Sequence, residues 1–352
     1  MRASDFVPVD RRNSFDLIRL CAALCVLISH QLGMAGYPEP PLGPLGIALA
    51  STGLYIFFAL SGYLVCQSWL RAPSTARFVR ARILRIYPAF LANIAFCVVL
   101  GAFLTTLPQI EFWQSPATWR FVALNAPILT VPTQFVLPGV FSDARWPIVN
   151  GSIWTIKYEL VCYLAFLGLM LATRSRSRTG LARNVLALTL AGLIVAYIHR
   201  ITVFPNPVGE AFFGYFNAFN MLRFFMTFGA GALYALSEPL GERVRLAFLA
   251  VPAALILFGP SPEFGRAGII LLLVLFMVEL GKSGIFFSNT YRRIGDLSYG
   301  TFLYGYPIQN LIVTRFYDGS NLMTVTLATV AGVFACAWLS WRYIEEPALR
   351  LK

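Results

Sequence analysis

Long apolar runs separated by short polar or basic segments make up most of this 352-residue sequence. An apolar run of about 20 residues is long enough to cross the hydrocarbon core of a bilayer as a helix. The fifth, seventh and eighth of the runs are shorter than the rest. The pattern predicts an all-α polytopic membrane protein in which residues 1–352 form a single domain. The predicted spans, about ten in number, are 15–35, 47–69, 86–107, 153–173, 184–199, 216–236, 246–259, 266–280, 297–316 and 321–341.

The overall composition agrees with a lipid environment. Hydrophobic residues make up 58% of the chain and charged residues only 12%, whereas soluble domains carry roughly 25% charged residues. A soluble chain of this length has no means of covering so much apolar surface, but apolar side chains that face lipid need no cover. None of the six cysteines has zinc-ligand spacing to His or Cys partners, so we expect no metal site.

Positive charge, which gives the chain a formal net charge of +12, lies in the gaps between the apolar runs. With a cytoplasmic N-terminus, most Arg and Lys residues fall on the cytoplasmic side. Because cytoplasmic loops carry the basic excess in membrane proteins, we predict that both termini are cytoplasmic. Nucleic acid is not an expected partner, since the chain offers no soluble basic face. The basic gaps serve either orientation alone or contact with an anionic lipid or cosubstrate.

The longest segment on the predicted outer side covers about 108–152 and is rich in tryptophan and proline. Within it, 119–130 is apolar but too short to span a bilayer, which favours a re-entrant or interfacial helix. A loop of this length suits a lid or a platform for an acceptor.

Ionisable residues inside predicted spans are costly in lipid and therefore mark candidate functional positions. Arg19 and His30 share the first span. Their separation of 11 residues is close to three helical turns, so both lie on one helix face, about 16 Å apart along the axis. Arg19 lies near the cytoplasmic end and His30 nearer the outer end. A histidine that is merely hydrogen-bonded inside the protein is the alternative, and its place within a membrane span favours a functional role.

Glu159 lies about 9 Å inside the outer end of the fourth span, at a depth similar to that of His30. We therefore predict that Glu159 orients His30 or pairs with its charge. A structural pair between Lys157 and Glu159 is the alternative, but residues two apart point to different faces of a helix.

Two further groups lie toward the cytoplasmic side. Ser61 and Gly62 in the second span fit either direct contact with a substrate or close packing of two helices, and the sequence favours neither. Arg80, Arg82 and Arg85 precede the third span. The planar guanidinium group suits phosphate oxygens, and simple orientation charge is the alternative for each arginine.

In this order the motifs resemble those of the bacterial acyltransferase-3 family of membrane O-acyltransferases. They are Arg19 followed by His30 in "RLCAALCVLISH", "FFALSGYLV" (57–65), "RARILRIYPAF" (80–90), "NGSIWTIKYEL" (150–160), "GDLSYGTFLYGYP" (295–307) and "EEP" (345–347). Many members place a histidine two residues before the proline of the late segment, where this chain has Gly305. We assign no role to Tyr304 or Tyr306 from the sequence.

The resemblance implies transfer of an acyl group, usually acetyl, from cytoplasmic acyl-CoA to a hydroxyl of a cell-envelope or secreted polysaccharide or a lipid-linked glycan. It implies a bacterial inner-membrane protein in contact with membrane lipid, and acyl-CoA as a cosubstrate with no tightly bound cofactor.

On this interpretation, His30 is the general base or is acylated transiently, and Glu159 supports it. Arg19, Arg80, Arg82 and Arg85 hold the phosphates of CoA, and its pantetheine arm passes Ser61 and Gly62. Trp154 and Tyr158 line the acceptor site or, alternatively, anchor the helix at the interface.

Two other classes fit parts of the sequence. A secondary transporter or glycan flippase shares the many spans and the charges within them, but such proteins often show internal repeats, and none is evident here. A structural membrane protein gives no reason for ionisable residues at matched depths.

Overall fold

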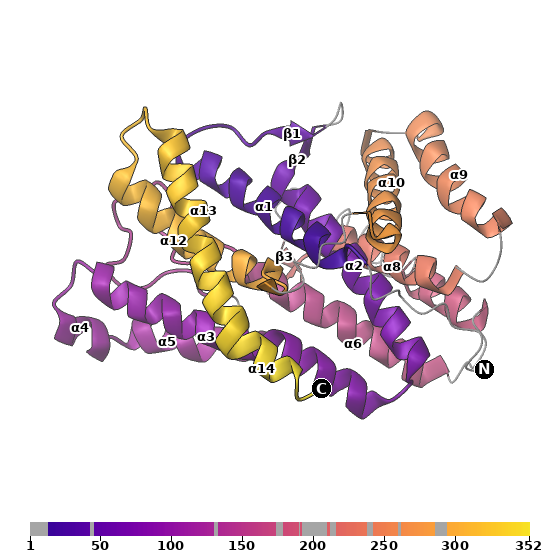
Figure 1. Ribbon diagram of the computed structural model, residues 1–352, viewed down its shortest axis with the longest axis horizontal. Coiled ribbons are helices and arrows are strands. Elements are labelled where there is room, and N and C mark those ends of the chain that lie inside the picture. The colour runs from indigo at the N-terminus through magenta and orange to yellow at the C-terminus, as the bar shows by residue number, and fades with distance from the viewer. Residues whose placement is uncertain are drawn as a thin grey trace. The chain divides into compact units, whose positions relative to one another are not determined.

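The computed structural model describes residues 13–42, 46–129, 133–173, 179–189, 191, 210–211, 216–237, 242–259, 262–285 and 294–352 (Figure 1). Within these residues the protein is all-helical apart from two short antiparallel strand pairs. The pairs are β1 (Pro41–Leu42) with β2 (Ile47–Ala48), and β3 (Glu210–Ala211) with β4 (Phe216–Asn217).

The described residues form two compact units. The first unit draws on Met1–Arg19, Pro41–Phe78 and Tyr158–Phe287, and the second on Leu20–Pro40, Val79–Lys157 and Ser288–Lys352. Three helices continue from one unit into the other along the chain, namely α1 (Phe15–Met34), α3 (Thr75–Leu104) and α6 (Ile156–Thr173).

The first unit centres on the pair α2 (Leu49–Arg71) and α8 (Ala218–Ser237). Their backbones approach so closely that a Cβ at Gly62 would lie 2.0 Å from the carbonyl oxygen of Phe228. The rings of Phe58 and Phe224 stack across the same pair, with centroids 4.1 Å apart. Small residues at the contact of two helices allow such an approach. The helices α9 (Glu242–Phe258) and α10 (Pro262–Ser283) and most of α6 also belong to this unit.

The second unit contains most of α1 and α3 together with the pair α12 (Ser298–Phe316) and α13 (Leu322–Ser340), which run side by side in Figure 1. The C-terminal residues continue α13 through a π-helical turn, η4 (Trp341–Glu345), into α14 (Glu346–Leu349). In the most apolar part of Leu322–Leu349, only 22% of the residues are buried inside the protein. Its exposed apolar side chains, such as Met323 and Leu327, suit contact with lipid.

Six helical stretches of the described chain are long and apolar enough to cross a membrane. They match the first four, the eighth and the tenth predicted spans, while the sixth, seventh and ninth correspond to α8, α9 and α12. The fifth predicted span lies mostly outside the described residues. The all-helical, multi-spanning character is confirmed, and the number of ten and the cytoplasmic termini stay predictions. The six stretches are Phe15–Met34, Leu49–Arg71, Thr75–Leu104, Ile153–Ala172, Phe264–Ser283 and Leu322–Leu349.

The structure differs from the prediction in the start of the third helix and adds detail within the segment 108–152. The third helix begins at Thr75 rather than at 86, because its basic first turns contain good helix formers that a search for apolar runs ignores. In the long segment 108–152, two short helices occur, α4 (Gln109–Gln114) and α5 (Pro116–Asn125). The side chain of Ser115 caps α5 by accepting a hydrogen bond from the backbone N–H of Ala117.

Candidate active site

The helix α1 carries Arg19 and His30 in one uninterrupted run of 20 residues. Arg19 lies one turn after Asp16, with 3.9 Å between the Nη1 and Oδ1 atoms of the pair. His30 is of intermediate exposure as a whole residue. The continuous helix bears out the expected helical spacing of these two residues.

The side chain that packs on His30 in the second unit is Tyr306 of α12. The two rings meet edge to face, with centroids 5.2 Å apart and an interplanar angle of 74°. Tyr306 is 3% exposed, and its buried hydroxyl has no hydrogen-bond partner among the described residues. Gly151 lies against the other side of this ring, since a Cβ there would come within 2.4 Å of Cε2 of Tyr306.

The position of Tyr306 depends on a proline in the next place along α12. Pro307 has no N–H group, so the carbonyl of Leu303 one turn earlier loses its helical hydrogen bond. Two buried asparagines replace it: the Nδ2 atoms of Asn93 and Asn150 lie 3.1 Å and 2.9 Å from that carbonyl oxygen. Asn150 also donates to Oδ1 of Asn93 at 2.9 Å. This clamp supplies the donors that a backbone carbonyl needs inside an apolar protein.

A second polar contact joins the same two helices beside His30. Gln309 Nε2 donates to the carbonyl of Leu27 at 2.6 Å and to Oε1 of Gln31 at 3.1 Å. Tyr306 and Gln309 are three residues apart and therefore lie on one face of α12. Tyr306 and Gln309 both contact α1. These contacts fix the face that each of the two helices turns toward the other near His30.

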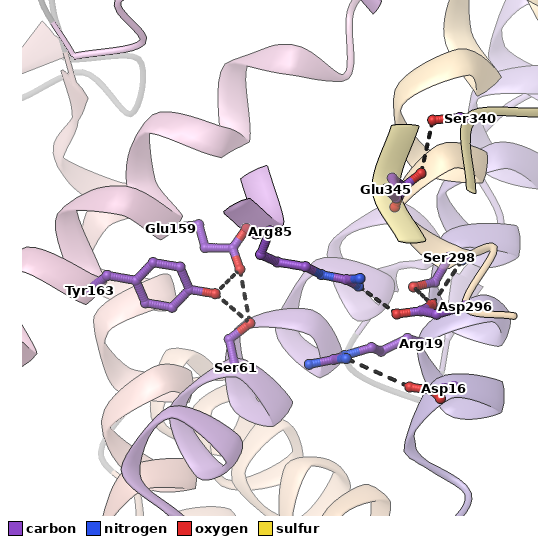
Figure 2. A network of polar contacts seen from close by, with 10 residues as sticks. All are labelled: Asp16, Arg19, Ser61, Arg85, Glu159, Tyr163, Asp296, Ser298, Ser340 and Glu345. Atoms are coloured by element: carbon purple, nitrogen blue, oxygen red, sulfur yellow. Dashed lines mark hydrogen bonds and ion pairs between the residues drawn. The ribbon is translucent and has the colours of Figure 1, made fainter. Parts of the chain in front are cut away.

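Glu159 of α6 belongs to a polar cluster inside the first unit. Its Oε1 atom accepts a hydrogen bond from Ser61 at 3.0 Å and another from the hydroxyl of Tyr163 (Figure 2). Tyr163 also lies within hydrogen-bonding distance of Ser61, at 3.4 Å. The structure thus brings together two of the residues predicted from the sequence, Ser61 and Glu159, and adds Tyr163 to them.

Gly62, next to Ser61, faces the backbone of α8 as described above. Of the two interpretations left open by the sequence, close helix packing is the one that this geometry favours for Gly62.

The three arginines of α3 have different surroundings within the second unit. Arg80 is exposed and Arg82 is half-buried. Arg85 forms an ion pair with Asp296, with 2.5 Å between Nη2 and Oδ2 (Figure 2). The guanidinium of Arg85 also lies 5.8 Å from the ring centre of Tyr299. Asp296 also accepts hydrogen bonds from Ser298. The guanidinium of Arg85 therefore ties α3 to the start of α12.

The two predicted acceptor residues lie near the start of α6. Trp154, in the short 3-10 helix η2 (Ile153–Thr155), is half-buried. Tyr158 is 2% exposed, its oxygen accepts a hydrogen bond from the backbone N–H of Asn217 at 2.7 Å, and its ring meets Phe224 edge to face. In this structure the contacts of Tyr158 are with the protein itself.

Sequence reasoning missed Tyr163, Tyr306, Asp296 and the asparagine clamp. A signal existed for the clamp, because a proline inside an apolar run frees a carbonyl that some side chain must satisfy. Asn93 and Asn150 were the available amides, but only the fold shows that they reach it. Among the described residues, no group of three or more His, Cys, Asp or Glu side chains is arranged to hold a metal ion.

The long apolar helices, with polar clusters buried between them, define a multi-pass membrane protein. The chain belongs to the acyltransferase-3 family, described as an acyltransferase domain, which matches residues 12–341, and it is accordingly an acyltransferase. The resemblance found in the sequence motifs is confirmed.

Two characterised relatives are similar over nearly the full chain. Nodulation protein 10 of Rhizobium leguminosarum bv. viciae is 29% identical over 362 aligned residues, covering 97% of this chain and 94% of that protein. The O-acetyl transferase of Shigella phage Sf6 is 24% identical over 349 residues, covering 96% of each. No solved structure matches the chain.

Proposed function

We propose that this acyltransferase moves an acyl group, most readily acetyl, from cytoplasmic acyl-CoA to a hydroxyl of a cell-envelope or secreted polysaccharide or a lipid-linked glycan. Similarity over nearly the full chain to a protein named O-acetyl transferase supports an acetyl group and an oxygen acceptor. The multi-pass character and the basic segments support a place in the bacterial inner membrane with both termini cytoplasmic.

The observation that carries the chemistry is the half-buried imidazole of His30 on a helix that also carries Arg19. A neutral imidazole takes the proton of the acceptor hydroxyl while the hydroxyl oxygen attacks the thioester carbonyl carbon. The new C–O bond forms, the C–S bond breaks, and CoA leaves as the thiol with that proton. A route through a transiently acylated His30 uses the same side chain and the same carbon.

The remaining roles are assigned by charge and place along the chain. Arg80, Arg82, Arg85 and Arg19 bind the phosphates of acyl-CoA, which acts as a cosubstrate without a tightly held cofactor. Exposed Arg80 is free to meet a phosphate from solution, and Arg85 has five N–H donors, which one carboxylate does not exhaust.

The helix α2, through Ser61 and Gly62, contributes to the wall along which the pantetheine arm passes. Glu159, bonded to Ser61 and Tyr163, supplies negative charge that supports His30. Trp154 and Tyr158 contribute to the acceptor site.

The test is release of free thiol from acetyl-CoA by detergent-purified protein, with and without crude cell-envelope glycan. The wild type is compared with His30→Ala and with His199→Ala, which removes the other histidine of the chain. We expect glycan-stimulated release that is lost in His30→Ala and kept in His199→Ala. Full activity in a folded His30→Ala protein would reject the role of His30. If the wild type released no thiol from any of a panel of acyl-CoAs, the result would favour a transporter or flippase.

A further inference from the structure

The hydroxyl of Tyr306 is a buried polar group without a partner, on a ring that packs edge to face on the imidazole of His30. No described residue accepts or donates a hydrogen bond to this hydroxyl, and the same holds for Gln31 Nε2 and Gln309 Oε1 close by. A hydroxyl that has lost water and gained no partner destabilises the folded protein. A buried polar group without a partner in the protein can be satisfied by a ligand that binds there.

The ring that carries this hydroxyl is held firmly in place. Gly151 packs against one of its edges so tightly that no Cβ fits between them. Pro307 follows it directly, and the clamp of Asn93 and Asn150 fixes the carbonyl that Pro307 leaves free. Fixed donors of this kind stabilise a developing negative charge well, because they need no reorganisation during the reaction.

Tyr304, two positions earlier on α12, is a comparison for Tyr306. It is 5% exposed, similar to Tyr306, but its hydroxyl is not one of the fully buried polar groups that lack a hydrogen-bond partner. Its ring packs edge to face on Phe96, with centroids 5.1 Å apart. The two tyrosines therefore share a helix and a degree of burial. They differ in their ring partners, His30 for Tyr306 and Phe96 for Tyr304, and of the two only Tyr306 has a fully buried hydroxyl without a partner.

We propose that Tyr306 is a catalytic residue whose hydroxyl donates a hydrogen bond to the carbonyl oxygen of the acyl group during transfer. This inference rests on the proposed function. The acceptor oxygen attacks the carbonyl carbon of the thioester while His30 takes the proton of the acceptor hydroxyl. The carbonyl π electrons move to the carbonyl oxygen, which becomes an oxyanion. When that electron pair returns, the C–S bond breaks and the thiolate of CoA receives the proton from His30. The same oxygen becomes negative if His30 is acylated first, so the role of Tyr306 holds for either route.

The kinetic test compares Tyr306→Phe with Tyr304→Phe, the same substitution on the same helix. In Tyr306→Phe we expect kcat for glycan-dependent transfer to fall by about 10²- to 10³-fold, with the KM for acetyl-CoA nearly unchanged. Its melting temperature should equal or exceed that of the wild type, because an unsatisfied hydroxyl is removed. Tyr304→Phe should keep kcat within a few-fold of the wild type, because the ring of Tyr304 packs on Phe96.

A spectroscopic measurement tests the same hydrogen bond without turnover. Acetyl-CoA labelled with 13C at the carbonyl is bound to His30→Ala and to His30→Ala/Tyr306→Phe, and its infrared carbonyl band is recorded. A hydrogen bond lowers the stretching frequency, so we expect the band to lie lower in the protein that keeps Tyr306. Identical bands, or a Tyr306→Phe protein with wild-type kcat, would overturn the proposal while wild-type transfer upholds the acyltransferase reaction. Failure of the wild type itself would overturn the proposed function instead.

Discussion

The two units contain polar clusters of different kinds. In the first unit, Glu159 accepts hydrogen bonds from Ser61 and Tyr163, and Glu279 is bonded to Tyr234 and Lys282. In the second unit, His30 is half-buried against a tyrosine whose hydroxyl has no partner among the described residues. A partnered carboxylate between helices holds those helices together as well as serving any reaction. A hydroxyl without a partner contributes no hydrogen bond to the fold, so the use that we propose for the Tyr306 hydroxyl is a chemical one.

The largest expected effect tests whether the first unit depends on close packing at α2 and α8. Gly62→Ala would place a Cβ 2.0 Å from the carbonyl oxygen of Phe228, and we expect a loss of about 3 kcal/mol of stability, since packed backbone atoms have little room to move. Gly305→Ala is the matched control, because its Cβ would find its nearest neighbour at 3.7 Å. Thermal unfolding in detergent measures both. Equal melting temperatures for the two variants would show that the α2–α8 contact is looser than described.

A second prediction concerns the clamp that supports Tyr306. Asn150→Leu removes a donor from the carbonyl of Leu303, and we expect a loss of about 1–3 kcal/mol of stability together with lower kcat. Pro307→Ala restores the missing backbone N–H at this position. In a Pro307→Ala background, the stability cost of Asn150→Leu should therefore be smaller.

A double-mutant cycle on thermal stability measures this coupling between Asn150 and Pro307. Strictly additive losses would mean that the asparagine does not replace the helical hydrogen bond.

The helices and the family could be predicted from the sequence, but the contacts around His30 and Leu303 could not. Apolar run length predicted the helices well, and the motif order predicted the family, because both are local properties of the chain. The start of α3 was predicted too late, because its basic first turns contain few apolar residues. The fifth span lies mostly outside the described residues. The partners of His30 and of Leu303 come from segments far away along the chain, and only the fold brings them together. Tyr306 was noted beside the departure at Gly305 but was given no role, because the sequence does not show that its ring packs on His30.

The third prediction asks whether the partnered carboxylate of the first unit also acts in catalysis. Glu159→Gln keeps an oxygen that accepts hydrogen bonds from Ser61 and Tyr163, so the fold should survive. Loss of the negative charge should lower kcat by about 10- to 100-fold if the carboxylate supports an imidazolium. Ser61→Ala removes one hydrogen bond but leaves the charge, and we expect only a few-fold change. Wild-type kcat in Glu159→Gln, measured by thiol release, would restrict this cluster to a structural role.

The smallest expected effect separates cosubstrate binding from orientation charge on α3. Arg80 and Arg77 are both exposed and lie one turn apart on this helix. If Arg80 contacts a phosphate of CoA, Arg80→Gln should raise the KM for acetyl-CoA by about two- to fivefold, as expected for an exposed charge pair. Arg77→Gln should have a smaller effect. Salt should weaken the binding of acetyl-CoA to the wild type more than to Arg80→Gln, because ions screen an exposed contact.

Acetyl-pantetheine sharpens this last prediction, since it keeps the thioester and the pantetheine arm but lacks the phosphates. Its KM should be the same for the wild type and for Arg80→Gln, because the contact that the substitution removes is absent from this donor. A rise in KM for both acetyl-CoA and acetyl-pantetheine would instead indicate that Arg80 acts through the local structure of α3 and not through a phosphate. Equal effects of Arg77→Gln and Arg80→Gln on the KM for acetyl-CoA would assign these two arginines to membrane orientation. The phosphates of the cosubstrate would then have to bind to Arg85, which is paired with Asp296, or to the half-buried Arg82.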